Sequence, residues 1–77
     1  MAVLLAERHI SGENTSCTSQ IIRDGADYIL ILSQNGDLRH ETDAEIIPET
    51  AALLLMNDWR RADPTATVRF PNVPIDY

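Results

Sequence analysis

The sequence predicts an α+β fold, in which a small antiparallel β-meander of three to five strands carries one α-helix, at about residues 48–62, on one face. Two dipeptides, Asp24-Gly25 and Asn35-Gly36, separate runs of β-branched and apolar residues, and such dipeptides are favoured in tight hairpin turns. A proline and an apolar stripe at helical spacing follow these runs. The length of 77 residues allows one domain, residues 1–77.

The strands of the meander are expected at residues 19–23, 28–33 and 38–46, each beside one of the two turn dipeptides. Residues 2–10 begin apolar and end charged, and we expect a further strand there. Residues 11–19 are rich in serine, threonine and asparagine, which is typical of a loop.

The helix is expected to begin at Pro48, because the first helical turn tolerates a residue without an N–H, and to end before Pro64. Its predicted apolar stripe consists of Ala51, Ala52, Leu55, Met56 and Trp59. Arg60 and Arg61 are expected in the last turn, where cations complement the helix dipole. After the helix, residues 65–70 favour one more strand and residues 71–74 an extended tail.

Hairpin pairing sorts the strand residues onto two faces of the sheet. With a two-residue loop at Asn35-Gly36, Ile31 lies opposite His40 and Ile29 opposite Thr42. One face is then largely apolar and is the expected seat of the helix; it holds Ile22, Ile29, Ile31, Leu38, His40, Thr42, Ala44 and Ile46. The other face mixes apolar and charged residues: Ile21, Arg23, Tyr28, Leu30, Leu32, Arg39, Glu41, Asp43 and Glu45.

This mixed face suits neither open solvent nor a dry core, because it combines large apolar side chains with carboxylates. We therefore expect something to cover it: residues 1–18, the C-terminal segment, a second subunit or a binding partner. A simpler alternative is that Arg23 and Arg39 pair with the carboxylates across the strands.

Twelve acidic residues outweigh six basic ones, all of them arginine, and give a net charge of −6. A negative field of this size repels nucleic acid and anionic membranes, and it suits a protein partner with a basic surface. The candidate partner-binding residues are Asp37, Glu41, Asp43, Glu45 and Glu49. The competing interpretation is that the charge serves solubility alone.

Alternate carboxylates on one strand stand about 6.5–7 Å apart. Two of them could share Mg²⁺, so Glu41, Asp43 and Glu45 form an alternative metal site, and Arg23 and Arg39 could hold phosphate. No other cofactor is expected. His9 and His40 lack partners at metal-ligand spacing.

The stretches Ile-Arg-Asp-Gly-Ala-Asp-Tyr-Ile-Leu, at 22–30, and Gly-Asp-Leu-Arg-His-Glu-Thr-Asp-Ala-Glu-Ile, at 36–46, resemble the middle of a CYTH domain. This family comprises tunnel-shaped enzymes that process triphosphates, and the resemblance covers about residues 20–55. It implies that Arg23 and Arg39 face a triphosphate and that Glu41, Asp43 and Glu45 line the tunnel. Ser33 stands where the family has a lysine, and the N-terminal Glu-x-Glu-x-Lys signature is missing, so the resemblance implies a degenerate binder and no enzyme.

The lone cysteine, Cys17, excludes an internal disulfide and favours a cytoplasmic setting. No apolar run reaches the length of about 18 residues that a membrane span needs. The sequence therefore predicts a non-enzymatic, acidic protein-binding module that inhibits a basic, nucleic-acid-binding partner, in the manner of phage anti-CRISPR proteins or immunity proteins. The alternatives are a degenerate triphosphate or divalent-metal binder and a structural subunit that forms a homodimer.

Overall fold

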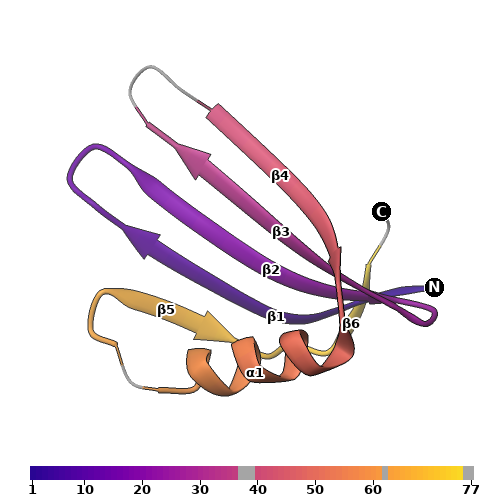
Figure 1. Cartoon of the computed structure of the whole chain (residues 1–77). Helices are drawn as coiled ribbons and strands as arrows, with labels where there is room; N and C mark the ends of the chain where they lie inside the picture. The colour runs from indigo at the N-terminus through magenta and orange to yellow at the C-terminus, as the bar shows by residue number, and fades with distance from the viewer. Residues whose placement is uncertain (37–39, 62, 76–77) are drawn as a thin grey trace.

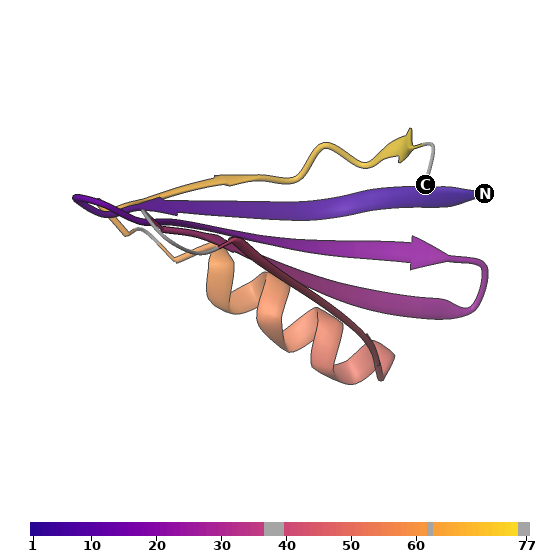
Figure 2. The same ribbon diagram turned by 90° about the horizontal axis from the view of Figure 1, so that it is seen from above.

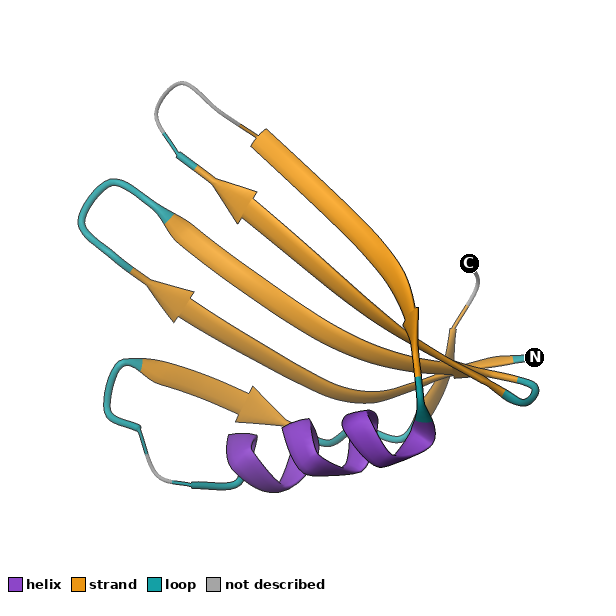
Figure 3. Ribbon diagram, in the orientation of Figure 1, coloured by secondary structure: helices purple, strands orange, loops and turns teal. Residues whose placement is uncertain are grey.

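In the computed structural model, which describes residues 1–36, 40–61 and 63–75, six strands form one antiparallel sheet and one helix packs against it (Figures 1 and 3). The elements are β1 (Ala2–Ser11), β2 (Ser16–Asp24), β3 (Asp27–Asn35), β4 (His40–Ile47), α1 (Glu49–Trp59), β5 (Ala66–Arg69) and β6 (Val73–Ile75). The strand order is β4-β3-β2-β1-β5, and β6 pairs with the start of β1. The predicted α+β meander with one helix is confirmed, whereas the predicted three to five strands are too few.

The hairpin between β2 and β3 turns one residue later than predicted. Asp24 pairs with Asp27, so the two-residue turn consists of Gly25 and Ala26. Gly25 has a φ of 62°, in the left-handed region that residues with a Cβ rarely adopt. This requirement for a positive φ explains why a glycine marks the turn.

The pairing of β3 with β4 differs from the predicted register by four residues. Ile29 lies opposite Ile46, whereas a two-residue turn at Asn35-Gly36 predicted Thr42 there. Because the shift is an even number of residues, every described side chain of β4 keeps its predicted face of the sheet. The division into a largely apolar face and a mixed face is therefore correct.

The two ends of the chain are more ordered than predicted. The strand expected at residues 2–10 is β1, but β2 begins at Ser16, so the predicted loop over 11–19 is too long. The strand expected at residues 65–70 is β5. Part of the expected extended tail is β6, which pairs with Ala2–Leu4 of β1.

The helix is shorter than predicted. Pro48 has an extended backbone, with φ −63° and ψ 152°, and precedes α1 as its N-cap. At the other end Arg60 is the C-cap, so Arg60 and Arg61 lie beyond the last turn of α1. The prediction that they belong to the last turn was therefore wrong. None of the described helices is long and apolar enough to cross a membrane.

The helix packs on the mixed face, not on the apolar face where we had expected it (Figure 2). The reason is the connection. β4 ends at Ile47, which points to the mixed face, and Pro48 alone joins it to Glu49, the first residue of α1. A one-residue connection leaves the helix no length to reach the other face. The mixed face is thus covered in part by the chain's own helix.

Two apolar clusters hold the sheet. On the helix side, the buried residues are Ala6, Ile21, Ala52, Met56 and Trp59. On the opposite side they are Ala2, Leu4, Ile22 and Ile29, with Ile31 and Ile75 packed against them. The register of β1 slips between Leu4 and Ala6. This strand therefore supplies Ala2 and Leu4 to one cluster and Ala6 to the other, although only one residue separates Leu4 from Ala6.

Candidate protein-binding surface

A groove of about 780 Å³ lies on the mixed face, between α1 and the β3–β4 side of the sheet. Leu30 of β3 and Ile47 of β4 line its sheet side, and Leu54 and Leu55 line its helix side. The rest of the lining is Glu45 from β4 together with Ala51, Asn57, Asp58 and Arg61, and the Arg61 guanidinium lies 3.8 Å from the Asp58 carboxylate in an exposed ion pair. The groove thus combines an apolar lining with the carboxylate of Glu45, which has no ion pair among the described residues, and with the ion pair of Asp58 and Arg61.

Exposed leucines lie in and around this groove. Leu54 is 69% exposed and Leu53 is 47% exposed, both on α1, and Leu32 of β3 is 43% exposed. Leu54 lines the groove, whereas Leu53 does not. A helix in which Leu53, Leu54 and Leu55 follow one another has more leucine than one buried stripe can use.

The acidic row of β4 consists of Glu41, Asp43 and Glu45, and its last residue, Glu45, lines the groove. The three residues alternate along the strand and lie opposite Gln34, Leu32 and Leu30 of β3. All three are exposed. Asp43 and Glu45 form no ion pair or side-chain hydrogen bond with any described residue, so both carboxylates are available to a partner.

The other predicted site residues lie apart from this row. Glu49 is exposed at the first position of α1. Arg23 of β2 is exposed and lies opposite Tyr28, so β3 separates it from the acidic row. Among the described residues, Arg23 has no ion pair with a β4 carboxylate. Asp37 and Arg39 lie outside the described residues.

No group of three or more histidine, cysteine, aspartate or glutamate side chains suited to a metal ion is found in the described part of the chain. The carboxylates of the acidic row alternate along an extended strand, which keeps neighbouring ones about 6.5–7 Å apart. Alternate residues of any strand have this spacing, so the row matches the spacing of side chains on a second strand.

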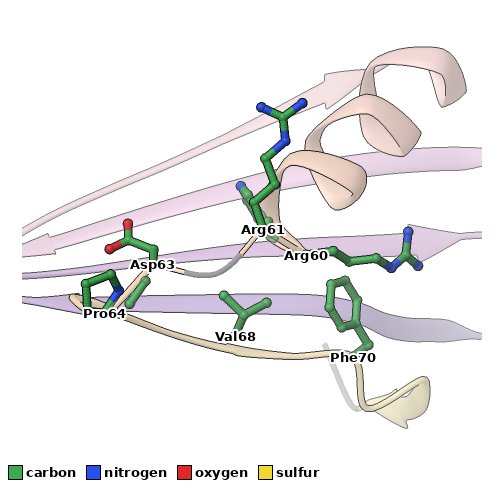
Figure 4. A pocket seen from close by; sticks show the side chains of 8 residues that line it. Arg60, Arg61, Asp63, Pro64, Val68 and Phe70 are labelled. Carbon is green, nitrogen blue, oxygen red and sulfur yellow. The ribbon is translucent and has the colours of Figure 1, made fainter.

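A second pocket, of about 510 Å³, lies between the end of α1 and β5 (Figure 4). Arg60 donates a hydrogen bond to the Asn57 side chain at 2.7 Å, and its guanidinium lies over the Phe70 ring at 4.8 Å. Asp63 accepts hydrogen bonds from the backbone N–H and the hydroxyl of Thr65, and these bonds lower the pKa of Asp63. These contacts brace the turn that leads into β5.

Arg8 of β1 lies beside this turn, with its guanidinium 5.1 Å from the centre of the Trp59 ring. Its buried Nε has no hydrogen-bond partner among the described residues. The cation lies on the face of an aromatic ring that is itself buried in the helix-side cluster, an arrangement that stabilises both groups. We assign Arg8 and Trp59 to the packing of α1 on the sheet.

Comparison of the chain with protein-family models, with curated proteins and with solved structures gave no match. Sequence reasoning identified the acidic row but missed Leu54 and Asp58, which lie on α1. The run of three leucines, at 53–55, was the available signal for an exposed apolar residue on this helix.

Proposed function

We propose that this chain is a small acidic protein-binding module, and that its binding surface consists of the groove between α1 and β3–β4 together with the acidic row of β4. One observation carries the proposal: a largely exposed leucine, Leu54, lines the same groove as the exposed carboxylate Glu45. Apolar residues that stay exposed beside a polar rim are typical of interaction sites.

The charge of the surface indicates the chemistry of the partner. Asp43 and Glu45 form no ion pair with any described residue, and the whole chain carries a net charge of −6. A partner with a basic surface and a protruding apolar side chain complements both parts of the site. Nucleic acid and anionic membranes carry the wrong charge for this surface.

A basic surface on a protein is often one that binds nucleic acid, and a tightly bound acidic module would block it. We therefore propose that the chain inhibits such a partner in the cytoplasm, in the way that immunity proteins and phage anti-CRISPR proteins act on their targets. This step rests on size and charge, and not on any shared motif.

The test is affinity capture from cells of the source organism with the wild-type chain and two single variants, Leu54→Ser and Leu53→Ser. Both leucines are exposed on adjacent positions of α1, but only Leu54 lines the groove. We expect at least one protein to be retained by the wild type and by Leu53→Ser and lost by Leu54→Ser. If every captured protein tolerates Leu54→Ser as well as Leu53→Ser, the groove is not the binding surface.

The same capture, repeated with a double variant, tests the acidic part of the surface. Asp43→Asn combined with Glu45→Gln removes two carboxylates, and Glu13→Gln combined with Asp27→Asn removes two exposed carboxylates from the loop after β1 and the start of β3. Each pair changes the net charge from −6 to −4. We expect only the first pair to lose the partner. An equal loss by both pairs would show that the total charge matters and its position does not.

A further inference from the structure

β4 is the edge strand of the sheet, and β3 is the only described strand that pairs with it. An edge strand presents N–H and C=O groups to which another chain can add a strand. We propose that the partner binds this edge with an extended basic segment that extends the sheet by one antiparallel strand. This inference rests on the proposed function and adds the shape of the partner's contact segment to it.

The geometry of β4 favours such an addition. Its pairing with β3 is unbroken from Tyr28 opposite Ile47 to Asn35 opposite His40, so the strand is regular over its described length. It contains neither proline nor glycine. Proline, bulges and very short strands are the usual protections of an edge against pairing. At the other side of the sheet, by contrast, the edge consists of the short strands β5 and β6, and β6 contains Pro74.

β4 is protected against pairing with other strands by its negative charge. This charge determines which kind of strand can pair with its edge. In a two-fold antiparallel pair of β4 strands centred on Asp43, this residue would lie opposite its copy and Glu41 would lie opposite Glu45 of the other chain. Like charges at opposite positions destabilise a strand pair. A second copy of this chain therefore fits the edge poorly, whereas a strand with lysine or arginine at every second position fits it well.

The other face of β4 indicates which residue types suit the alternate positions of the partner strand, between its basic residues. Thr42, Ala44 and Ile46 lie on that face and are exposed, and Ile46 has 70% of its surface accessible. β-Branched side chains pack well against such neighbours. The segment that fits is therefore a strand in which basic residues alternate with valine, isoleucine or threonine.

The probe is a capped, fluorescently labelled peptide of about seven residues in which lysine alternates with valine, long enough for one strand pairing. Two isomeric peptides carry three N-methyl groups each, one only on lysines and the other only on valines. Successive N–H groups of a strand point to opposite edges, so only one of the two sets can face β4. A fourth peptide has the same composition with its lysines clustered at one end.

By fluorescence anisotropy at low salt, we expect the parent peptide to bind and one N-methylated isomer to bind at least about tenfold more weakly, because it has lost the hydrogen bonds to β4. The other isomer should stay within about threefold of the parent, and the clustered peptide should be about fivefold weaker or worse. Equal affinities of the two isomers, or equal losses by both, would overturn strand addition, and so would a parent peptide that fails to bind. A partner lost on Leu54→Ser in the capture experiment would still uphold the protein-binding function.

Discussion

Asp43 on the edge strand β4 lies directly opposite Leu32 on β3, on the face of the sheet that carries α1. Leu32 is 43% exposed, so the helix covers only part of this face and leaves an apolar residue beside a carboxylate at its outer side. Farther along the same pair of strands, Leu30 and Glu45 repeat this arrangement and line the groove. The surface is amphipathic across the strands, which suits a partner that brings both apolar and basic side chains.

The two free carboxylates of the acidic row are expected to contribute to binding and not to stability. Asp43 and Glu45 have no partner among the described residues and repel each other along the strand. We predict that Asp43→Asn combined with Glu45→Gln leaves the melting temperature within about 4 °C of the wild type, or raises it, since each exposed substitution changes stability by about 0.5 kcal/mol or less. Thermal unfolding followed by circular dichroism measures this, and a fall of more than about 5 °C would show that the row has a structural role.

A matched pair of isoleucines tests the two environments of the sheet. Ile21 is fully buried beneath α1, whereas Ile46 is largely exposed on β4. We predict that Ile21→Val lowers the free energy of unfolding by about 0.5–1.5 kcal/mol, because it removes a buried methyl group. Ile46→Val should change it by less than about 0.5 kcal/mol. Urea unfolding of both variants measures the difference, and equal losses would contradict the helix position.

Much of this arrangement was predictable from the alternation of side chains, and the particular failures have physical causes. The faces of Leu30 and Glu45 were assigned correctly, because the pairing error in the hairpin was an even number of residues. The prediction of the face that the helix covers was wrong. That face depends on the last residue of β4, Ile47, and on the one-residue connection through Pro48. The alternation of apolar and polar residues indicates neither where the strand ends nor how long the connection is.

The C-terminal strand and the groove were missed for a different reason. β6 has three residues and includes Pro74, so no local propensity marks it, and it forms because β1 offers a free edge beside it. The exposure of Leu54 depends on where the helix sits relative to β3. Both features depend on contacts between distant parts of the chain, and no local sequence pattern indicates these contacts.

Glu7 gives the fold a dependence on acidic pH. Its carboxylate accepts hydrogen bonds from Gln20 and from Arg69, both at 2.9 Å, and these contacts lower the pKa of Glu7 in the folded state. A lowered folded-state pKa contributes stability above the unfolded pKa, and this stability is lost as the pH falls through the folded value.

We therefore predict that Glu7→Gln lowers the melting temperature by about 2–5 °C at pH 7, corresponding to a partly exposed ion pair worth about 0.5–1 kcal/mol or less. The difference between this variant and the wild type should shrink as the pH falls below 4.5, the ordinary pKa of the side chain. Glu13→Gln, at an exposed residue of the loop after β1, is the control and should show no difference at either pH. If the difference in melting temperature between Glu7→Gln and the wild type stayed constant from neutral to acidic pH, packing and not charge would explain the effect of the substitution.

The triphosphate alternative makes a separate prediction. Because the described residues contain no cluster of three or more suitable metal ligands, and the carboxylates of β4 are exposed, we expect neither Mg²⁺ nor tripolyphosphate at millimolar concentration to raise the melting temperature. A ligand at about 100 times its dissociation constant would stabilise the fold by about 2.7 kcal/mol, which is easily detected. A rise that is abolished by Arg23→Ala would revive the CYTH-like interpretation.

The most direct test of the proposed surface is a ¹H–¹⁵N NMR titration of the wild-type chain with the alternating lysine–valine peptide, at about 0.05 M and about 0.5 M salt. We expect the largest amide shift changes at residues 41–47 of β4 and 54–58 of α1, and we expect them to weaken strongly at the higher salt concentration, because charge attraction is screened. Changes centred on β1 and β5, or changes that are indifferent to salt, would contradict a binding surface made of Leu54 and the β4 carboxylates.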